Sequence, residues 1–347
     1  MKKILILVPD LKLTGGVANY YRFLDLKELD NIDYFNINGG YFNNVFLRLI
    51  ERYISFLLIV FKYDLVHVNP SLLRKSYLRD SIFIILAKLL NRKVIVFIRG
   101  WDLSFEDNIK TNKIYRFIFN RIWKRVDKFL VLGKTFQDKL IKMGIESSIS
   151  IETTLSTYQN ANEKKLEKTI YLLFISRLVK EKGIYIAIDT IEILIKKYKI
   201  NNIILNIAGD GKIFAEVQSY INKKNMNNIN LLGNVTGKEK DELYKKSHIM
   251  LFPTYFGEGL PNSILEGMGS GLPIISRINA GIPDQVIDNE NGFLTDSKDP
   301  EWFAKKIYFL LENKDIYCRI SSNNINKSEY YSIKSIKGRL LNYYEEI

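Results

Sequence analysis

Apolar strand-like segments alternate with amphipathic helix-like segments along the first half of the chain. The strand-like segments span residues 3–8, 64–69, 93–99 and 128–132, with a weaker one at 34–37. Helical spacing of apolar residues covers 16–27, 45–62, 73–90, 109–125 and 135–143. Because the strand-like segments are nearly continuous runs of Val, Ile and Leu, they predict parallel strands that helices cover on both faces. The alternation therefore predicts a doubly wound α/β sheet.

The same alternation restarts after a polar stretch, residues 153–168, which lacks periodicity and indicates a linker. The predicted strands of the second half are 170–176, 203–209, 229–232, 249–252 and 273–276, and the predicted helices are 183–198, 214–224, 239–246, 262–269, 300–313 and 333–344. We therefore expect two Rossmann-like domains, residues 1–160 and 161–330, that face each other across a cleft. Ligands of such domains bind at the carboxyl ends of the strands. The last segment, 331–347, is expected to form a helix that packs back on the first domain.

Composition limits the class of protein. The 347 residues include one cysteine, Cys318, and two histidines, His67 and His248. A single cysteine excludes a disulfide framework and favours a reducing, cytoplasmic location. Without a Cys/His cluster we expect no metal site. The N-terminal apolar run stops at Val8, too short for a secretory signal, and no run reaches the roughly 20 residues of a membrane-spanning helix.

The net charge of +13 is concentrated in the first half of the chain. Residues 1–160 carry 25 Lys and Arg against 15 Asp and Glu, whereas residues 161–347 carry 26 against 23. The helical segments 45–62 and 73–90 combine apolar faces with basic residues, a pattern typical of helices that bind anionic membranes. This pattern predicts peripheral association with the inner face of the cell membrane; the alternative is helices that only cover the sheet. The balanced charge of the second half argues against nucleic acid.

The stretch from Glu258 to Glu266 follows the predicted strand 249–252 and enters the predicted helix 262–269. A strand that ends in a glycine-containing turn at a helix N-terminus can bind an anion, because unpaired N–H groups point outward there and the helix dipole favours negative charge. The second carboxylate, inside the helix, can accept hydrogen bonds from a diol such as a ribose. Taken alone, the stretch also fits an ordinary turn with two solvated glutamates.

Other turn-rich loops follow the neighbouring strands. Arg177 and Lys182 flank the turn after strand 170–176, where two cations can hold a diphosphate and neutralise it as a leaving group. Further turns lie at 208–211, 232–235, 277–284 and 291–294, and Gly15-Gly16 follows the first strand of the chain. Each loop alone fits a solvated turn. Because the carboxyl ends of parallel strands share one edge, the set indicates a binding edge in the second domain.

The combination resembles the retaining glycosyltransferases of family 4, also called glycosyl transferase group 1, which have the GT-B fold. The matching residues are Arg177, Lys182-Gly183, Gly209-Asp210-Gly211, Glu258 through Glu266, Gly281-Ile282-Pro283 and Gly292-Phe293-Leu294. The second half matches almost throughout, whereas the first half matches by its alternation and by Gly15-Gly16.

The resemblance implies a role for each matching residue. Arg177 and Lys182 would bind the donor diphosphate and stabilise its departure, and Glu266 would hold the ribose hydroxyls. Glu258 would lie near the transferred sugar. The remaining donor-binding candidates are Gly16, Gly209, Asp210, Val235, Gly259, Leu260, Asn262 and Ser263.

The first domain departs from the family pattern at one position. Members often carry a histidine near the reacting sugar, and Arg99 stands at or beside that position. An arginine cannot be a general base, but it can bind a phosphate or a sugar hydroxyl on the acceptor side. Asp102 is the nearest candidate proton acceptor. His67 is a second acceptor-side candidate, with a packed strand histidine as the alternative.

These observations predict a metal-independent, retaining glycosyltransferase of the hexosyltransferase type. A UDP- or GDP-sugar would be its co-substrate, without any other cofactor. The acceptor would be a saccharide or lipid-linked saccharide in the biosynthesis of bacterial surface polysaccharide, such as O-antigen, capsule or lipopolysaccharide. The alternatives are a GT-B nucleotide-sugar epimerase, which needs no acceptor, and a non-catalytic protein that binds a nucleotide-sugar or a polyanion.

Overall fold

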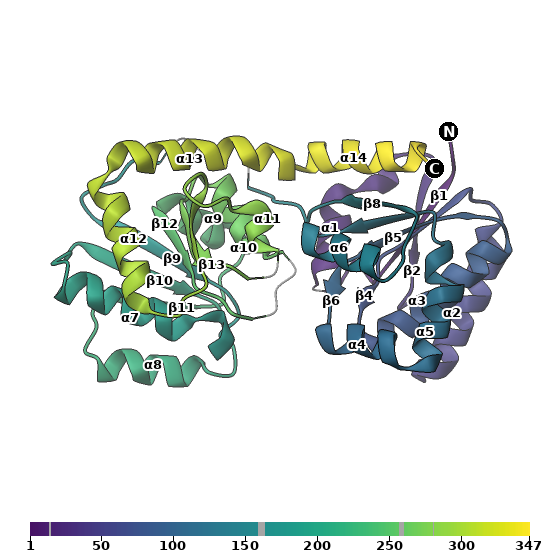
Figure 1. Cartoon of the computed structure of the whole chain (residues 1–347), viewed down its shortest axis with the longest axis horizontal. Coiled ribbons are helices and arrows are strands. Elements are labelled where there is room, and N and C mark those ends of the chain that lie inside the picture. Colours follow the sequence, from purple (N-terminus) through teal and green to yellow (C-terminus); the bar gives the residue numbers. More distant parts are fainter. Residues whose placement is uncertain (14, 159–163, 257–259, 280) are drawn as a thin grey trace. The chain divides into compact units, whose positions relative to one another are not determined.

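Two compact units make up the chain in the computed structural model, which describes residues 1–13, 15–158, 164–256, 260–279 and 281–347 (Figure 1). The first unit combines Met1–Thr154 with Ile333–Ile347, and the second spans Leu155–Ser332. The sequence placed the boundary after residue 160, whereas contacts place it after Thr154. Within the described ranges, no helix is both long and apolar enough to cross a membrane.

The first unit is built on a parallel sheet with the strand order β2-β1-β3-β5-β7-β8. Its strands are β1 (Ile4–Val8), β2 (Ile32–Asn36), β3 (Leu65–Val68), β5 (Lys93–Ile98), β7 (Lys128–Val131) and β8 (Ser148–Ile151), with a small separate sheet of β4 (Ser71–Leu72) and β6 (Gly100–Trp101). Every residue of β1, β3 and β7 is buried, as the continuous apolar runs predict. Strand β8 was not predicted, because its Ser-Ile-Ser-Ile sequence is short and half polar.

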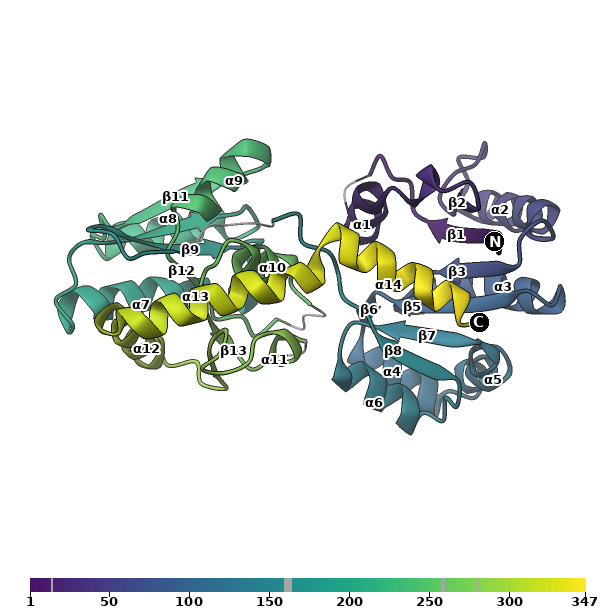
Figure 2. The same ribbon diagram turned by 90° about the horizontal axis from the view of Figure 1, so that it is seen from above.

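Helices cover this sheet. They are α1 (Gly16–Leu24), α2 (Val45–Val60), α3 (Arg74–Leu89), α4 (Leu103–Thr111), α5 (Lys113–Arg121), α6 (Lys134–Lys142) and α14 (Ile333–Glu345), with 3-10 turns η1 (Leu26–Glu28) and η2 (Trp123–Arg125). Helix α14 lies beside α1, and α2 lies beside α3 (Figure 2). The single helix predicted over 109–125 is wrong. The Asn112 side chain accepts hydrogen bonds from the backbone N–H groups of Ile114 and Tyr115, so it ends α4 and caps α5.

The second unit has a parallel sheet with the order β11-β10-β9-β12-β13-β14. The strands are β9 (Ile170–Ile175), β10 (Ile203–Ala208), β11 (Ile229–Gly233), β12 (Ile249–Phe252), β13 (Ile274–Arg277) and β14 (Gly292–Thr295). The helices are α7 (Ile184–Lys196), α8 (Phe214–Lys223), α9 (Gly237–Lys246), α10 (Asn262–Gly269), α11 (Ile282–Gln285), α12 (Pro300–Glu312) and α13 (Lys314–Ser328), with η3 (Lys180–Lys182) and η4 (Glu329–Tyr331). The predicted α/β fold of two Rossmann-like units is therefore confirmed.

Alternate side chains of the central strands enter two separate cores. On β12, Ile249 and Leu251 join the core under α7 and α12, whereas Met250 and Phe252 join the core under α9 and α10. This alternation shows that the sheet is covered on both faces. Helix α13 was not predicted, because its polar sequence hides the helical period.

The central strand of each sheet creates a switch point. In the second unit, β9 lies between β10 and β12, and the chain leaves β9 for β10 but reaches β12 only later. The loops after β9 and β12 therefore run to opposite faces and leave a crevice at the carboxyl edge, where such sheets bind ligands. In the first unit, β1 occupies the same place between β2 and β3.

The structure has strand β14 where the sequence predicted a turn at 291–294. The first residue of this strand, Gly292, must be a glycine. Gly292 has φ of 156°, and an added Cβ would lie 1.8 Å from the carbonyl oxygen of Ile274 on β13. The backbones of β13 and β14 therefore approach too closely for any side chain.

Replacing this glycine tests the close approach. We expect Gly292→Ala to lower the free energy of unfolding by about 2 kcal/mol or more, because the methyl group clashes with backbone. The matched control is Gly338→Ala in α14, where an added Cβ meets nothing within 4 Å. It is expected to raise stability by about 0.5–1 kcal/mol through helix propensity. Urea denaturation measures both, and equal effects of the two substitutions would contradict the account.

Candidate functional site

The loop after β9 is tied to both neighbouring loops of the second unit. The backbone N–H of Leu178 donates to the Asp210 carbonyl at 2.9 Å, and the N–H of Tyr255 donates to the Glu181 carbonyl at 2.8 Å. Gly183 has φ of 79°, and an added Cβ would lie 2.2 Å from the Pro253 carbonyl oxygen. Only glycine permits this approach, which holds the loop with its basic residues against the end of β12.

Lys182 and Arg177, predicted as the diphosphate ligands, lie together on this loop. The Lys182 side chain is 8% exposed, and its Nζ lies 4.8 Å from the centre of the Phe256 ring. The exposed Arg177 guanidinium lies 5.6 Å from the same ring. Burial, and secondly Arg177, lowers the pKa of the Lys182 ammonium to about 8. Two cations close together over one aromatic ring form a site that an anion stabilises.

The N-terminus of α10 lies at the same carboxyl edge, because β12 leads into it. Its N-cap is Pro261, and no side chain in the described part of the chain caps it. Asn262 is exposed and Ser263 is half-buried, so the first N–H groups of the helix are available to an anion. Two further predicted ligands, Glu258 and Gly259, lie outside the described residues.

Glu266 lies one turn into α10 and already has two partners. Its Oε1 accepts from Lys240 Nζ and its Oε2 from the Tyr244 hydroxyl, both at 2.7 Å. Tyr244 is fully buried, and burial followed by the Glu266 charge raises its pKa well above the ordinary value. The Glu266 side chain is 12% exposed, and a carboxylate can accept about four hydrogen bonds. The Glu266 carboxylate is therefore held in place and can still accept further hydrogen bonds.

Sequence reasoning missed the two residues that hold Glu266. Lys240 and Tyr244 lie on α9, a helix that reads as an ordinary charged surface helix, so no motif marks them. Phe256 was also missed, because a phenylalanine near a buried strand looks like core.

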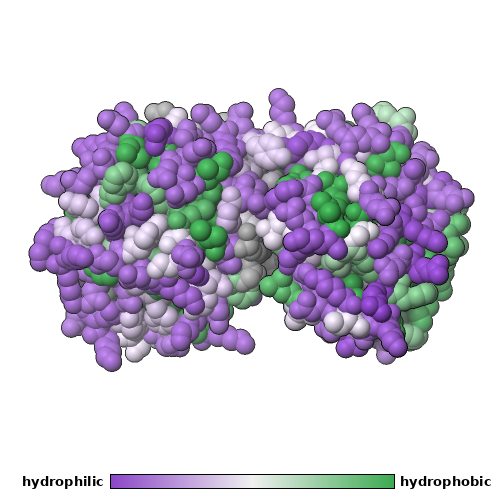
Figure 3. Space-filling view, viewed as in Figure 1, coloured by the Kyte–Doolittle hydropathy of each residue, from purple (hydrophilic) through white to green (hydrophobic). Residues whose placement is uncertain are grey.

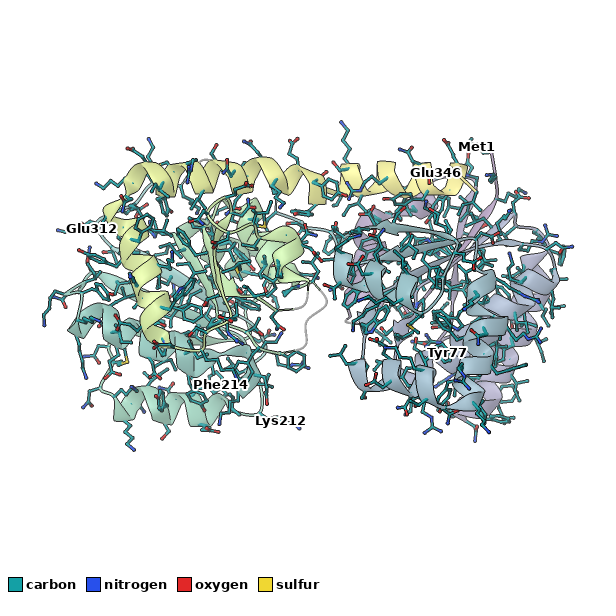
Figure 4. The ribbon with its side chains drawn as sticks, in the orientation of Figure 1. Met1, Tyr77, Lys212, Phe214, Glu312 and Glu346 are labelled. Carbon is teal, nitrogen blue, oxygen red and sulfur yellow. The ribbon has the colours of Figure 1, made fainter. Side chains whose placement is uncertain are left out.

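The other donor-side candidates have structural roles. Gly209 has φ of 140°, and an added Cβ would lie 1.8 Å from the Ser176 carbonyl oxygen. The Asp210 carboxylate accepts from the N–H of Gly211, in the loop that leads to Lys212 and Phe214 (Figure 4). The side chains of Val235 and Leu260 are buried in the core under α9 and α10, which leaves only their backbone for a ligand.

In the first unit, Gly16 starts α1 and has open space around it. An added Cβ at Gly15 or Gly16 would meet no atom of the described residues within 4 Å. Room for a ligand therefore exists beside the backbone at the end of β1.

Arg99 lies at the end of β5 between two aromatic rings. Its guanidinium carbon is 3.8 Å from the centre of the Tyr20 ring and 3.6 Å from that of Phe97. Its Nε donates to the Asn69 side-chain oxygen at 3.2 Å. Its Nη2 is buried, without a hydrogen-bond partner in the described part of the chain. The stacking fixes a cation at the carboxyl edge of the first sheet.

The assignment of His67 to the acceptor side is wrong. His67 is fully buried, with its ring nitrogens 2.7 Å from the Tyr344 hydroxyl and 3.4 Å from that of Tyr21. Burial, and secondly Arg99, lowers its pKa well below the ordinary value, so it stays neutral. Since Tyr344 belongs to α14, the imidazole serves to dock that helix.

Asp102, the predicted proton acceptor, is the N-cap of α4. Its Oδ1 accepts from the N–H of Phe105 at 2.8 Å and from the Ser104 hydroxyl at 2.5 Å. These hydrogen bonds, that of Ser104 first, lower the pKa of Asp102. A carboxylate so engaged is a poor base. Among the described residues, no group of three or more His, Cys, Asp or Glu side chains could hold a metal ion.

Two parallel α/β units, with cations and a helix N-terminus at the switch point of the second, are typical of the GT-B fold. Solved structures confirm this fold. HepE of Anabaena, crystallised in complex with UDP, superimposes with a TM-score of 0.78 at 16% identity and covers 99% of this chain and 100% of its own.

Sequence comparison finds similarity to glycosyltransferases. Residues 157–327 match the family model for glycosyl transferases group 1. An uncharacterized glycosyltransferase of Methanocaldococcus jannaschii is 23% identical over 351 residues, which are 96% of this chain and 94% of the relative. The amylovoran biosynthesis glycosyltransferase AmsK of Erwinia amylovora is 25% identical over 227 residues, 62% of this chain and 54% of AmsK. The chain is thus similar to group 1 glycosyltransferases over residues 157–327 and to one glycosyltransferase over almost its whole length.

The lowered pKa of Lys182 predicts how anion binding depends on pH. Below about pH 8 the ammonium is charged, and a bound anion raises its pKa further. The affinity for inorganic pyrophosphate should therefore fall as pH rises above 8, by up to about tenfold per pH unit. The arginine side chain of the Lys182→Arg variant stays protonated over this pH range, so the affinity of the variant for pyrophosphate should fall less. Ionisation of pyrophosphate itself affects both proteins equally, so the variant serves as the control for it. Calorimetric titration from pH 7 to 10 measures both proteins, and identical slopes would contradict the assignment.

Proposed function

We propose that the chain is a metal-independent, retaining hexosyltransferase that uses a UDP- or GDP-sugar as donor. The observation that carries this proposal is the buried Lys182 beside Arg177 at the switch point of the second sheet. The HepE complexes with UDP and with UDP-glucose support a nucleotide-sugar donor.

The donor would be held along the carboxyl edge of the second unit. Arg177 and Lys182 would bind the diphosphate, with the backbone N–H groups of Asn262 and Ser263 at the start of α10 as further donors. Glu266, fixed by Lys240 and Tyr244, would accept hydrogen bonds from the ribose hydroxyls with its remaining lone pairs.

Further contacts to the donor would come from glycines and from buried loop residues. Glu258 would lie near the transferred sugar, together with Gly259, and Gly16 would admit a phosphate beside the backbone of the first unit. The backbone of four further residues, Gly209, Asp210, Val235 and Leu260, would line the base and sugar pockets. Gly209 has no room for a side chain, the Asp210 carboxylate is hydrogen-bonded within its own loop, and the side chains of Val235 and Leu260 are buried in the core.

The reaction breaks the bond between the anomeric carbon and the diphosphate oxygen. The acceptor oxygen then bonds to the anomeric carbon on the same face, and the departing phosphate oxygen takes the acceptor proton. Lys182 and Arg177 would stabilise the negative charge that develops on the diphosphate. This route needs no protein base, which agrees with Arg99 at the family's histidine position and with Asp102 as a helix cap. Arg99 would instead bind the acceptor.

The acceptor we propose is a saccharide or lipid-linked saccharide in bacterial surface polysaccharide biosynthesis. AmsK, named for amylovoran biosynthesis, supports the polysaccharide. The protein would work in the cytoplasm at the inner face of the membrane, where a lipid-linked acceptor is presented.

Substitutions at the donor edge test the roles. We expect Lys182→Ala, Arg177→Ala and Glu266→Ala each to lower kcat/KM for sugar transfer by about 10²–10³-fold, because each removes charge stabilisation or donor binding. The matched control is Lys180→Ala, an exposed lysine of the same loop, which should retain activity. Transfer of radiolabelled sugar is the measurement. Full activity of the Lys182 and Glu266 variants would overturn the roles.

A thermal-shift screen against UDP, GDP, ADP and their sugar conjugates identifies the donor. A ligand at 100 times its Kd should stabilise the protein by about 2.7 kcal/mol. Stabilisation by a UDP- or GDP-sugar followed by sugar transfer supports the proposal. An epimerised donor without any acceptor would identify the epimerase, and nucleotide-sugar binding without turnover would identify the non-catalytic binding protein. No stabilisation by any nucleotide would contradict both enzymes and leave only the polyanion-binding alternative.

A further inference from the structure

Most side chains of the apolar helix α2 are not buried. Its 16 residues are mostly Val, Phe, Leu and Ile, yet only Phe56 and Val60 are buried. Phe46 is 70% exposed and Leu58 is 66% exposed. Soluble domains rarely leave a continuous apolar helix face in water unless something binds it.

Most of the exposed apolar residues of α2, together with its C-cap Phe61, form one continuous stripe. Its members are Leu47, Ile50, Ile54, Leu57, Leu58 and Phe61, which are all exposed and follow one another at helical spacing, so they lie on the same side of the helix. Figure 3 shows apolar residues along the right-hand edge of the first unit, where Figure 1 draws α2. The stripe is thus an outward surface rather than scattered side chains.

A groove of about 440 Å³ runs between α2 and α3 beside this stripe. Leu49, Ile50 and Tyr53 line it from α2, and Leu78 and Ile82 line it from α3. Its wall is therefore largely apolar, which suits a hydrocarbon chain.

Cations surround the groove. Arg48, Lys75 and Arg79 also line it. Arg79 is paired with the buried Asp80 at 2.8 Å, whereas Arg48 and Lys75 form no ion pair within the described part of the chain. The acid of α2, Glu51, is paired with Arg52 at 2.8 Å. The surface therefore offers uncompensated positive charge next to an apolar groove.

We propose that this α2–α3 surface, the stripe of α2 with the groove and its cations, docks on an anionic membrane, and that the groove takes an acyl chain of an anionic lipid. The charges select this occupant. A second copy of the same surface would bring cations against cations, whereas lipid phosphates neutralise Arg48 and Lys75 while the apolar stripe leaves water. The inference deepens the proposed function, on which it rests only for the lipid-linked acceptor.

Vesicle flotation of the full chain tests the docking. We expect binding to vesicles that contain phosphatidylglycerol and not to vesicles of phosphatidylcholine alone, with weaker binding at high salt. Leu58→Glu and Lys75→Glu should each reduce binding by about tenfold or more. The matched controls are Ile287→Glu, an apolar residue of the second unit that is 44% exposed, and Lys223→Glu, an exposed lysine on α8. Both controls should bind like the wild type.

Lipid contact is measured with Ile50→Trp and brominated phosphatidylglycerol, which quenches a tryptophan that touches the acyl chains. We expect quenching of the added tryptophan and none with Ile287→Trp, each corrected for the native tryptophans. Equal binding to both vesicle types, no loss with Leu58→Glu, or a concentration-dependent dimer that Leu58→Glu dissociates would each overturn the inference. Stabilisation by UDP or GDP is measured without lipid. A failure of vesicle binding therefore does not contradict the proposed donor site, and a failure of nucleotide binding does not contradict the proposed membrane surface.

Discussion

The proposed site of the second unit depends on the placement of one cation. The Lys182 ammonium is buried near the Arg177 guanidinium and contacts the Phe256 ring. Burial disfavours the charged form of this lysine and lowers its pKa. In the proposed function a diphosphate would supply negative charge beside this ammonium. The same arrangement would then stabilise the negative charge that grows on the diphosphate as the sugar leaves.

The backbone around this lysine has little freedom. The loop after β9 is bonded to the loops after β10 and β12, and two close approaches are possible only because Gly183 and Gly209 have no Cβ. These glycines match the family's pattern for a structural reason, since they bring the cations to the crevice rather than touch a ligand through a side chain. Tyr244 and Lys240 likewise fix Glu266, the proposed ribose ligand, through two hydrogen bonds.

Much of this organisation could be predicted from the sequence, because it depends on local pattern. Continuous apolar runs predicted the parallel strands, and the helix predicted over 262–269 is confirmed as α10. Asn112 carried a capping signal that the longer apolar period of 109–125 obscured. The environments of His67 and Glu266 could not be predicted, because they depend on contacts between residues far apart in the sequence. His67 is buried by Tyr344, a partner 277 positions away, and Glu266 is held by residues on another helix.

Amide hydrogen exchange with and without the nucleoside diphosphate, UDP or GDP, that stabilises the protein tests whether the crevice between β9 and β12 holds the donor diphosphate. We expect this nucleotide at saturation to slow exchange of the backbone N–H groups in two segments, 177–183 after β9 and 260–264 at the start of α10. Slowing confined to other segments, or no change at saturation, would contradict this assignment.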